Sequence, residues 1–219
     1  MQVSHSRVEC FENCPFKYRL RYIEGLNTVK ADIIRDSLLS TKREGIEDLL
    51  QYMQDIGFLT SPASTQFHGA YEGALAEHSV NVLTYAEKLG VAWLGGAEYN
   101  KIHNSVVICA ILHDLGKCGQ FGKPLYVENV LKSGKTSDAK PYTTNPDLMT
   151  LPHEIVSVIE ATKFIDLTEE EQRAIAWHNG LYGCFKYDIQ GKETMLYMII
   201  HFADLWVSRI VESKVKNES

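Results

Sequence analysis

The chain of 219 residues is 45% hydrophobic and 23% charged, values typical of a globular protein with one domain and an ordinary core. Its formal net charge of −6 argues against broad electrostatic binding to DNA or RNA, although it does not exclude a nucleotide substrate. The five cysteines form an odd set without a repeating spacing, which favours reduced thiols and a cytoplasmic location.

The first part of the chain, residues 1–35, is aromatic and basic. We expect it to form a helical appendage in two pieces divided at Pro15, which packs on the main domain (residues 36–215) or binds a protein partner. Cys10 and Cys14 are too few ligands for a metal site by themselves. The polar first residues are not those of a signal peptide, and no apolar run is long enough to span a bilayer. We therefore expect no membrane association.

The segment from Cys14 to Tyr18 resembles the opening of RecB-like nucleases, in which a similar Cys-Pro-x-x-Tyr segment precedes the catalytic core. The resemblance covers only about twenty residues, and no closely spaced Pro-Asp…Glu-x-Lys core follows it in this chain. It therefore does not imply nuclease activity.

A helix is expected at 46–56, because Ile46, Leu49, Leu50 and Met53 form one apolar stripe and Gly57 follows. His68 comes shortly afterwards and is expected either to contact substrate at the mouth of the site or merely to pack there. Two long helices follow at 72–89 and 100–117, and the pattern predicts breaks at Gly90 and at Gly95-Gly96. The first of these helices carries His78 among its apolar residues.

The second long helix contains the apolar run Val106–Leu112, which stops at His113-Asp114-Leu115-Gly116-Lys117. Such an apolar helix belongs in a core, where an unpartnered imidazole and carboxylate cost several kcal/mol, on the order of 2–7 for a neutral polar group. A metal cation satisfies both groups, because it accepts imidazole nitrogen and carboxylate oxygen as ligands. We therefore interpret His113 and Asp114 first as metal ligands.

Glycines and prolines interrupt the stretch between Lys117 and Pro152, so a long helix is excluded there. The residues 125–131 followed by Lys132-Ser133-Gly134-Lys135 predict a small β-hairpin inserted between ligand-bearing segments. Two interpretations are open: a lid whose side chains contact phosphates, or a solvated charged hairpin. The candidate lid residues are Lys123, Lys132, Lys135, Lys140 and Tyr142.

Three more helices complete the expected order. The first runs from Pro152 to about Phe164 and begins with His153, which either binds metal or faces solvent in the first turn. Thr168 caps the second, whose end delivers His178. The third runs from Glu193 to Val211 and carries Asp204. His201, three residues earlier, is expected to support the site or pack in the core. Arg209 either reaches the substrate or solvates the helix end, and the second role is the favoured one.

The order of Glu77-His78-Ser79, His113-Asp114-Leu115-Gly116-Lys117 and a late Asp204 resembles the HD superfamily of metal-dependent phosphohydrolases. The intervening His153 and His178 resemble its two-metal branch, as in HD-GYP-type phosphodiesterases. The chain lacks the Gly-Tyr-Pro signature, so activity on cyclic dinucleotides is not implied. The resemblance spans roughly residues 68–212 and implies an all-α helical bundle, to which the chain adds its small hairpin.

The resemblance also implies a mechanism. His78, His113, Asp114 and Asp204 would hold one metal, and Asp114, His153 and His178 a second. One or two divalent ions (Mn, Fe, Ni, Co or Zn) would activate a water for attack on phosphorus. Asp114 could help to deprotonate that water, and Lys117 is the expected phosphate contact and catalytic cation. The expected substrate is a small phosphorylated compound such as a nucleotide.

Other functions stay open from the residues alone. Some proteins with this motif set are 3′–5′ exonucleases, but the negative charge does not favour nucleic acid. The chain could also be an inactive metal-binding regulatory or adaptor module that binds a partner through residues 1–35. An alarmone hydrolase and a two-iron oxygenase use similar ligands. Lys117 and the order of the motifs favour hydrolysis.

Overall fold

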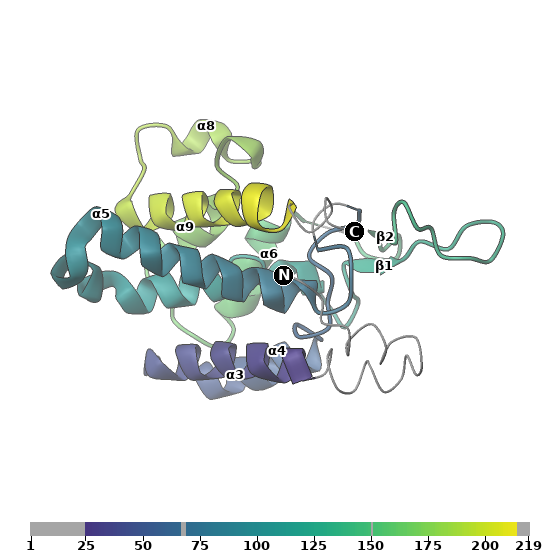
Figure 1. Cartoon of the computed structure of the whole chain (residues 1–219), viewed down its shortest axis with the longest axis horizontal. Coiled ribbons are helices and arrows are strands. Elements are labelled where there is room, and N and C mark those ends of the chain that lie inside the picture. Colours follow the sequence, from purple (N-terminus) through teal and green to yellow (C-terminus); the bar gives the residue numbers. More distant parts are fainter. Residues whose placement is uncertain (1–24, 67–68, 150, 214–219) are drawn as a thin grey trace, which may run out of the picture.

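The computed structural model describes residues 25–66, 69–149 and 151–213, and these are predominantly helical (Figure 1). Two strands within the described residues pair to form a small sheet. The expected all-α fold with a small hairpin is therefore confirmed. The elements in chain order are α3 (Gly25–Ser40), α4 (Ile46–Asp55), α5 (Ala74–Leu112), η2 (Leu115–Cys118), β1 (Tyr126–Glu128), β2 (Tyr142–Thr144), α6 (His153–Ala161), α7 (Glu169–Trp177), η3 (Gly180–Tyr182), α8 (Lys186–Ile189), α9 (Met195–Trp206) and η4 (Val207–Val211).

The central element, α5, is folded back on itself at Gly95, whose φ of 73° and ψ of 159° lie outside the helical region. The two halves run side by side in opposite directions, since a Cβ on Gly90 would touch the ring of Tyr99. His103 likewise lies 3.3 Å from Glu87. The predicted break at Gly90 is wrong: Gly90 stays helical and is buried, and the space its missing side chain leaves is filled by Tyr99.

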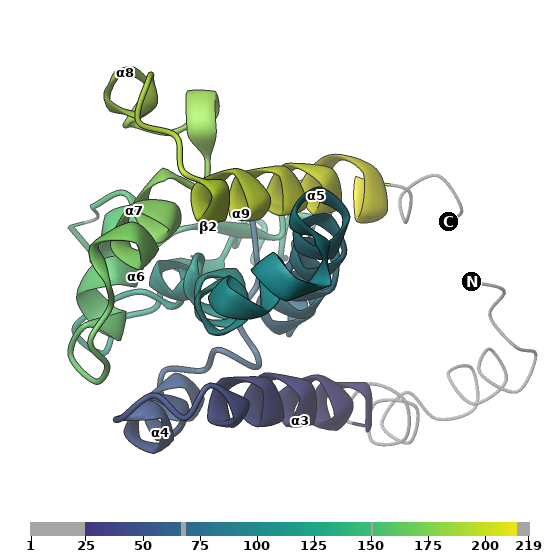
Figure 2. The same ribbon diagram turned by 90° about the vertical axis from the view of Figure 1, so that its left-hand side faces the viewer.

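The other helices cover this folded helix in layers. α9 lies against one side of α5, and α3 packs on the opposite side (Figure 2). α6 and α7 pack side by side, and α7 also contacts α9. Each helix buries one apolar face in a shared core. The core includes the fully buried side chains Leu38, Leu49, Phe58, Leu75, Ile108, Ile175 and Ile199.

The helix ends agree with the local sequence. α4 covers most of the predicted helix and buries Ile46, Leu49 and Met53. Thr168 forms the expected cap of α7: its side chain accepts from the Glu171 N–H, and the Glu171 carboxylate accepts from the Thr168 N–H. This capping box fixes the start of the helix that ends at His178.

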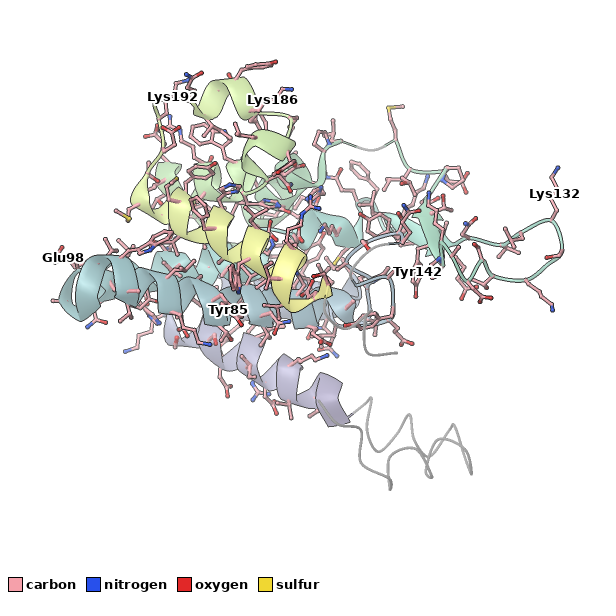
Figure 3. All side chains as sticks on the ribbon, turned by 45° about the horizontal axis from the view of Figure 1, so that its top comes forward. Tyr85, Glu98, Lys132, Tyr142, Lys186 and Lys192 are labelled. Carbon is pink, nitrogen blue, oxygen red and sulfur yellow. The ribbon has the colours of Figure 1, made fainter. Side chains whose placement is uncertain are left out.

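The inserted hairpin pairs β1 with β2 in antiparallel register, with Tyr126 opposite Thr144. The partner strand lies further along the chain than the turn at Lys132-Ser133-Gly134-Lys135, so the hairpin is longer than predicted. Figure 3 places Lys132 at the outer tip of this insertion, far from the helices.

Predictions for residues 1–24, including the two helical pieces, Cys10 and Cys14, lie outside the described residues, as does His68. α3 runs through the expected boundary between residues 35 and 36, and the division into two parts stays a prediction. Among the described helices, none combines the length and apolar character needed to cross a membrane.

Candidate metal centre

His113 and Asp114 stand at the end of the apolar half of α5. Every residue from Val106 to Leu112 is buried, and α5 ends at Leu112. Asp114 then begins the tight 3₁₀ turn η2 that carries Lys117. The buried helix before the pair is as predicted, but it ends at Leu112 and a turn follows, so the predicted helix end at residue 117 is wrong.

The back-folding of α5 brings His78 to His113, although 35 residues separate them. Their Nε2 atoms lie 3.2 Å apart. From α9, the Oδ1 atom of Asp204 lies 3.2 Å from the same His78 nitrogen, and Asp114 Oδ2 lies 3.5 Å from it. These four predicted ligands therefore converge on one point between α5 and α9.

His153 and His178 approach the other oxygen of the same carboxylate. The Nε2 atom of His153 lies 3.1 Å from Asp114 Oδ1, and that of His178 lies 3.5 Å from it. Gly116 permits the approach of α6, because a Cβ at this position would lie 2.2 Å from the His153 carbonyl oxygen. The Gly116 N–H also donates to Ser157 Oγ at 2.8 Å.

All four histidines point the same ring nitrogen into the cluster, because an acceptor holds the other one. Nδ1 of His113 contacts the Ala110 carbonyl at 2.9 Å, and Nδ1 of His178 contacts the Ile175 carbonyl at 2.7 Å. The matching acceptors are Glu212 for His78 (3.1 Å) and Glu154 for His153 (3.3 Å). An Nδ1–H that donates in this way leaves the Nε2 lone pair for a metal.

The donor set fits a transition-metal centre. Two groups of three ligand atoms lie close enough to share an ion: His78, His113 and Asp204, and His113, Asp114 and His178. Asp114 Oδ1 is buried and accepts no hydrogen bond, although such an oxygen is costly to leave unpartnered. Imidazole nitrogens mixed with carboxylate oxygens suit Mn, Fe, Co, Ni or Zn. A cation beside Asp114 would supply the missing partner.

The protonation of the cluster follows from burial and neighbouring charge. Burial lowers the pKa of His78, but its contacts with Asp204 and Glu212 outweigh burial and raise the pKa to about 10. Burial alone would raise the pKa of Asp114, yet the Lys117 ammonium and the His113 ring hold it well below its usual value. Asp114 is therefore ionised at neutral pH. His78 is protonated at that pH, so a metal that binds His78 Nε2 must displace the His78 proton.

A cavity of about 720 Å³ opens beside the cluster. His153, His178, Asp204 and Lys117 line it, and the Lys117 ammonium lies 2.6 Å from Asp114 Oδ2. The hairpin lysines are not among the lining residues; Tyr126 from β1 is. Lys123 instead donates to the Asp147 carbonyl. The arrangement thus favours the solvated hairpin over the lysine lid.

The sequence interpretation missed several residues of the site. Glu212 contacts His78 Nδ1, Asn179 donates to Glu154 at 2.8 Å, and the same amide nitrogen lies 3.1 Å from His178 Nε2. Tyr182 lines the cavity as well, and so does Arg209, which favours the substrate contact left open for Arg209 over solvation of the helix end. For Asn179, adjacency to His178 was the available signal. Glu212 has no local signal, because it follows Asp204 by two helical turns in an unremarkable polar tail.

His201 agrees with the prediction of a supporting role. Its Nδ1–H donates to the His178 carbonyl at 2.7 Å, and its ring fills the space above Gly180. A side chain on Gly180 would collide with this ring, and the φ of +54° at Gly180 also favours glycine. His201 therefore fixes the backbone that carries His178 and Asn179.

Comparison with protein families gives two matches. The model of the HD domain matches residues 75–184, which is half of the chain and contains His78, His113, Asp114, His153 and His178. The model of the PD-(D/E)XK nuclease superfamily matches residues 2–43, in agreement with the N-terminal resemblance. Comparisons with curated proteins and with solved structures gave no significant match. On its motifs, its fold and this match, the chain belongs to the HD domain family.

Proposed function

We propose that the protein is a metal-dependent phosphohydrolase that hydrolyses a phosphoester of a nucleotide or a related small phosphate. The observation that carries the proposal is the convergence of four Nε2 atoms and two carboxylates beside a cavity, with a buried Asp114 Oδ1 that accepts no hydrogen bond. Membership of the HD domain family supports it. The proposed reaction is attack of a water on the substrate phosphorus.

The proposed ligands are His78, His113, Asp114 and Asp204 for one ion, and Asp114, His153 and His178 for a second. A bound divalent ion would lower the pKa of water and neutralise phosphate charge. The Nδ1 acceptors described above keep each ring in the tautomer that binds metal. Asp114 has one oxygen toward each half of the set, so it is the proposed bridging ligand and the acceptor of a proton from water.

Lys117 is the proposed phosphate contact. Burial lowers its pKa, but the Asp114 carboxylate outweighs this and raises the pKa above its ordinary value, so the ammonium stays charged. Its side chain is 14% exposed and lines the cavity, where a cation is little screened by solvent. A fixed positive charge at this position stabilises the negative charge that develops on a phosphoryl group during transfer.

The test is phosphate release from adenosine 5′-monophosphate and from p-nitrophenyl phosphate by protein loaded separately with Mn²⁺, Fe²⁺, Co²⁺, Ni²⁺ or Zn²⁺. We expect turnover with at least one metal, and loss of it in the double variant His113→Ala, Asp114→Ala. His103→Ala is the matched control, because this histidine pairs with Glu87 on the surface, away from the cluster. Turnover that survives in the double variant would contradict the proposal.

A second candidate is a 3′–5′ exonuclease that acts at the metal cluster; the match of residues 2–43 to a nuclease superfamily is compatible with a nucleic-acid substrate but does not assign the reaction. A single-stranded oligonucleotide with a 5′ label distinguishes the two functions. Stepwise shortening from the 3′ end that depends on His113 and Asp114 would favour the exonuclease. Absence of turnover on every substrate, with metal bound, would favour the metal-binding regulatory module.

A further inference from the structure

The cavity extends beyond the metal ligands, along the end of the last helix. Its volume of about 720 Å³ is that of a pocket for a small organic molecule, and a phosphate alone is far smaller. Beyond Asp204, the lining includes Ser208 and Arg209 from this helix and Tyr182 from η3. The substrate that this cavity fits therefore has a substantial group attached to its phosphate.

The last helix changes type where Ser208 and Arg209 lie. After Trp206 the chain forms a π-helix, η4, in which the Glu212 N–H donates to the Val207 carbonyl at 3.0 Å. π-turns are rare and occur frequently at functional sites. Ser208, Arg209 and Glu212, which all belong to this turn or follow it directly, line the cavity. Ser208 donates to Asp204 Oδ1 at 3.0 Å, which connects this wall to the metal cluster.

Arg209 and Tyr182 form a cation–π pair, and both line the cavity. The guanidinium carbon lies 5.6 Å from the centre of the Tyr182 ring. Among the described residues no acidic side chain forms an ion pair with Arg209. Tyr182 is 75% exposed, although it lines a cavity. An accessible aromatic face next to a planar cation is the combination on which nucleobases stack.

We propose that Tyr182 and Arg209 bind the base of a nucleoside monophosphate whose phosphate lies at the metal cluster. This inference rests on the proposed function and names the substrate class of the same site. The base stacks on the exposed face of Tyr182, and Arg209 holds the tyrosine ring in place. The positive charge of Arg209 also attracts an anionic substrate to the mouth of the cavity.

The experiment compares two substrates that differ only in the base, adenosine 5′-monophosphate and ribose 5-phosphate. The ratio of their kcat/KM values isolates the contribution of the base. We expect Tyr182→Ala to lower this ratio by about 5- to 100-fold, the range for loss of one stacked base. Tyr182→Phe keeps the ring and is expected to keep the ratio. Arg209→Lys keeps the charge without the planar group and should lower the ratio.

Tyr187→Ala is the control for loss of an exposed tyrosine, because Tyr187 is 82% exposed on α8 and does not line the cavity. It should leave the ratio unchanged. The proposal is overturned if Tyr182→Ala lowers kcat/KM equally for both substrates, or for neither. That outcome leaves phosphohydrolase activity itself intact.

Equilibrium binding separates the two proposals when neither phosphate is hydrolysed. Calorimetric titration of metal-loaded protein with adenosine 5′-monophosphate would then show weaker binding in Tyr182→Ala than in wild type if the base site exists. Equal affinity, or no binding to wild type, would overturn the base site. Absence of hydrolysis with Tyr182-dependent binding would refute the proposed function alone.

Discussion

Replacement of Gly116 by alanine tests how the fold sets the distance between the two halves of the metal cluster. A Cβ at this position would lie 2.2 Å from the His153 carbonyl oxygen, about 1.2 Å short of the 3.4 Å at which ordinary contact begins. It would also lie 2.8 Å from Val156 Cβ. Because these atoms belong to α6 itself, a side-chain rotation cannot relieve the clash, and α6 must move.

The substitution should change two quantities, the melting temperature and the rate of the reaction. Overpacking of this kind costs about 1–3 kcal/mol, which for a chain of this length lowers Tm by about 2–12 °C. His153 is the first residue of α6, so its Nε2 moves away from Asp114 Oδ1, to which it now lies 3.1 Å. A displacement of about 1 Å in such a site can cost on the order of 100-fold in rate.

Thermal unfolding followed by circular dichroism, with elemental analysis of bound metal, measures both effects. Gly96→Ala is the matched control, because nothing lies within 4 Å of a Cβ there. The control should be neutral or more stable by about 0.4–1 kcal/mol. If Gly116→Ala melts within about 1 °C of wild type, against the range expected from overpacking, and keeps its metal content, the reasoning is refuted.

Three further predictions concern charge. Burial raises the pKa of Glu171, but Arg43 and the Thr168 N–H outweigh burial and lower this pKa below 4.5. The ionised Glu171 therefore stabilises the fold above pH 4.5, and this stabilisation is lost as the pH falls through the folded-state pKa. Glu171→Gln should reduce the loss of unfolding free energy at acidic pH, measured by urea titration at several pH values. Glu212→Gln should weaken metal binding by about 10- to 100-fold, measured by competition with a chelator, because it loosens the hold on His78 Nδ1. Because the pKa of His78 without metal is about 10, metal binding at pH 7 should release the His78 proton, and metal affinity should rise with pH. Calorimetry in buffers of different ionisation enthalpy measures the number of protons released. Zero proton release would contradict the prediction.

Much of the site was predictable from local sequence. A few neighbouring residues are enough to predict the buried run before His113-Asp114 and the helix cap at Thr168. Motif order then adds His78, His153, His178 and Asp204, which the fold brings to the same cluster. For these residues, the role predicted from the sequence motif and the position in the structure agree.

The remaining features depend on contacts between distant segments. Gly90 suggests a helix break in the sequence. In the structure the helix continues through Gly90, and Tyr99 from the returning half of α5 packs where a Gly90 side chain would lie. The sequence leaves open whether the hairpin is a basic lid or a solvated loop; in the structure Tyr126 pairs with Thr144 and the hairpin lysines do not line the cavity. Arg209 lines the cavity from a π-helical turn, and such a turn has no simple sequence signature.

The most direct test of the central claim is the number of metal ions per chain, measured by elemental analysis of protein purified without chelators. We predict one or two ions of Mn, Fe, Co, Ni or Zn in wild type, and fewer in His153→Ala if a second ion is bound. The double variant His113→Ala, Asp114→Ala should bind none while its helical circular dichroism is largely retained. Unchanged metal content in the double variant, or no metal in wild type after reconstitution, would contradict the assignment of this cluster as a metal centre.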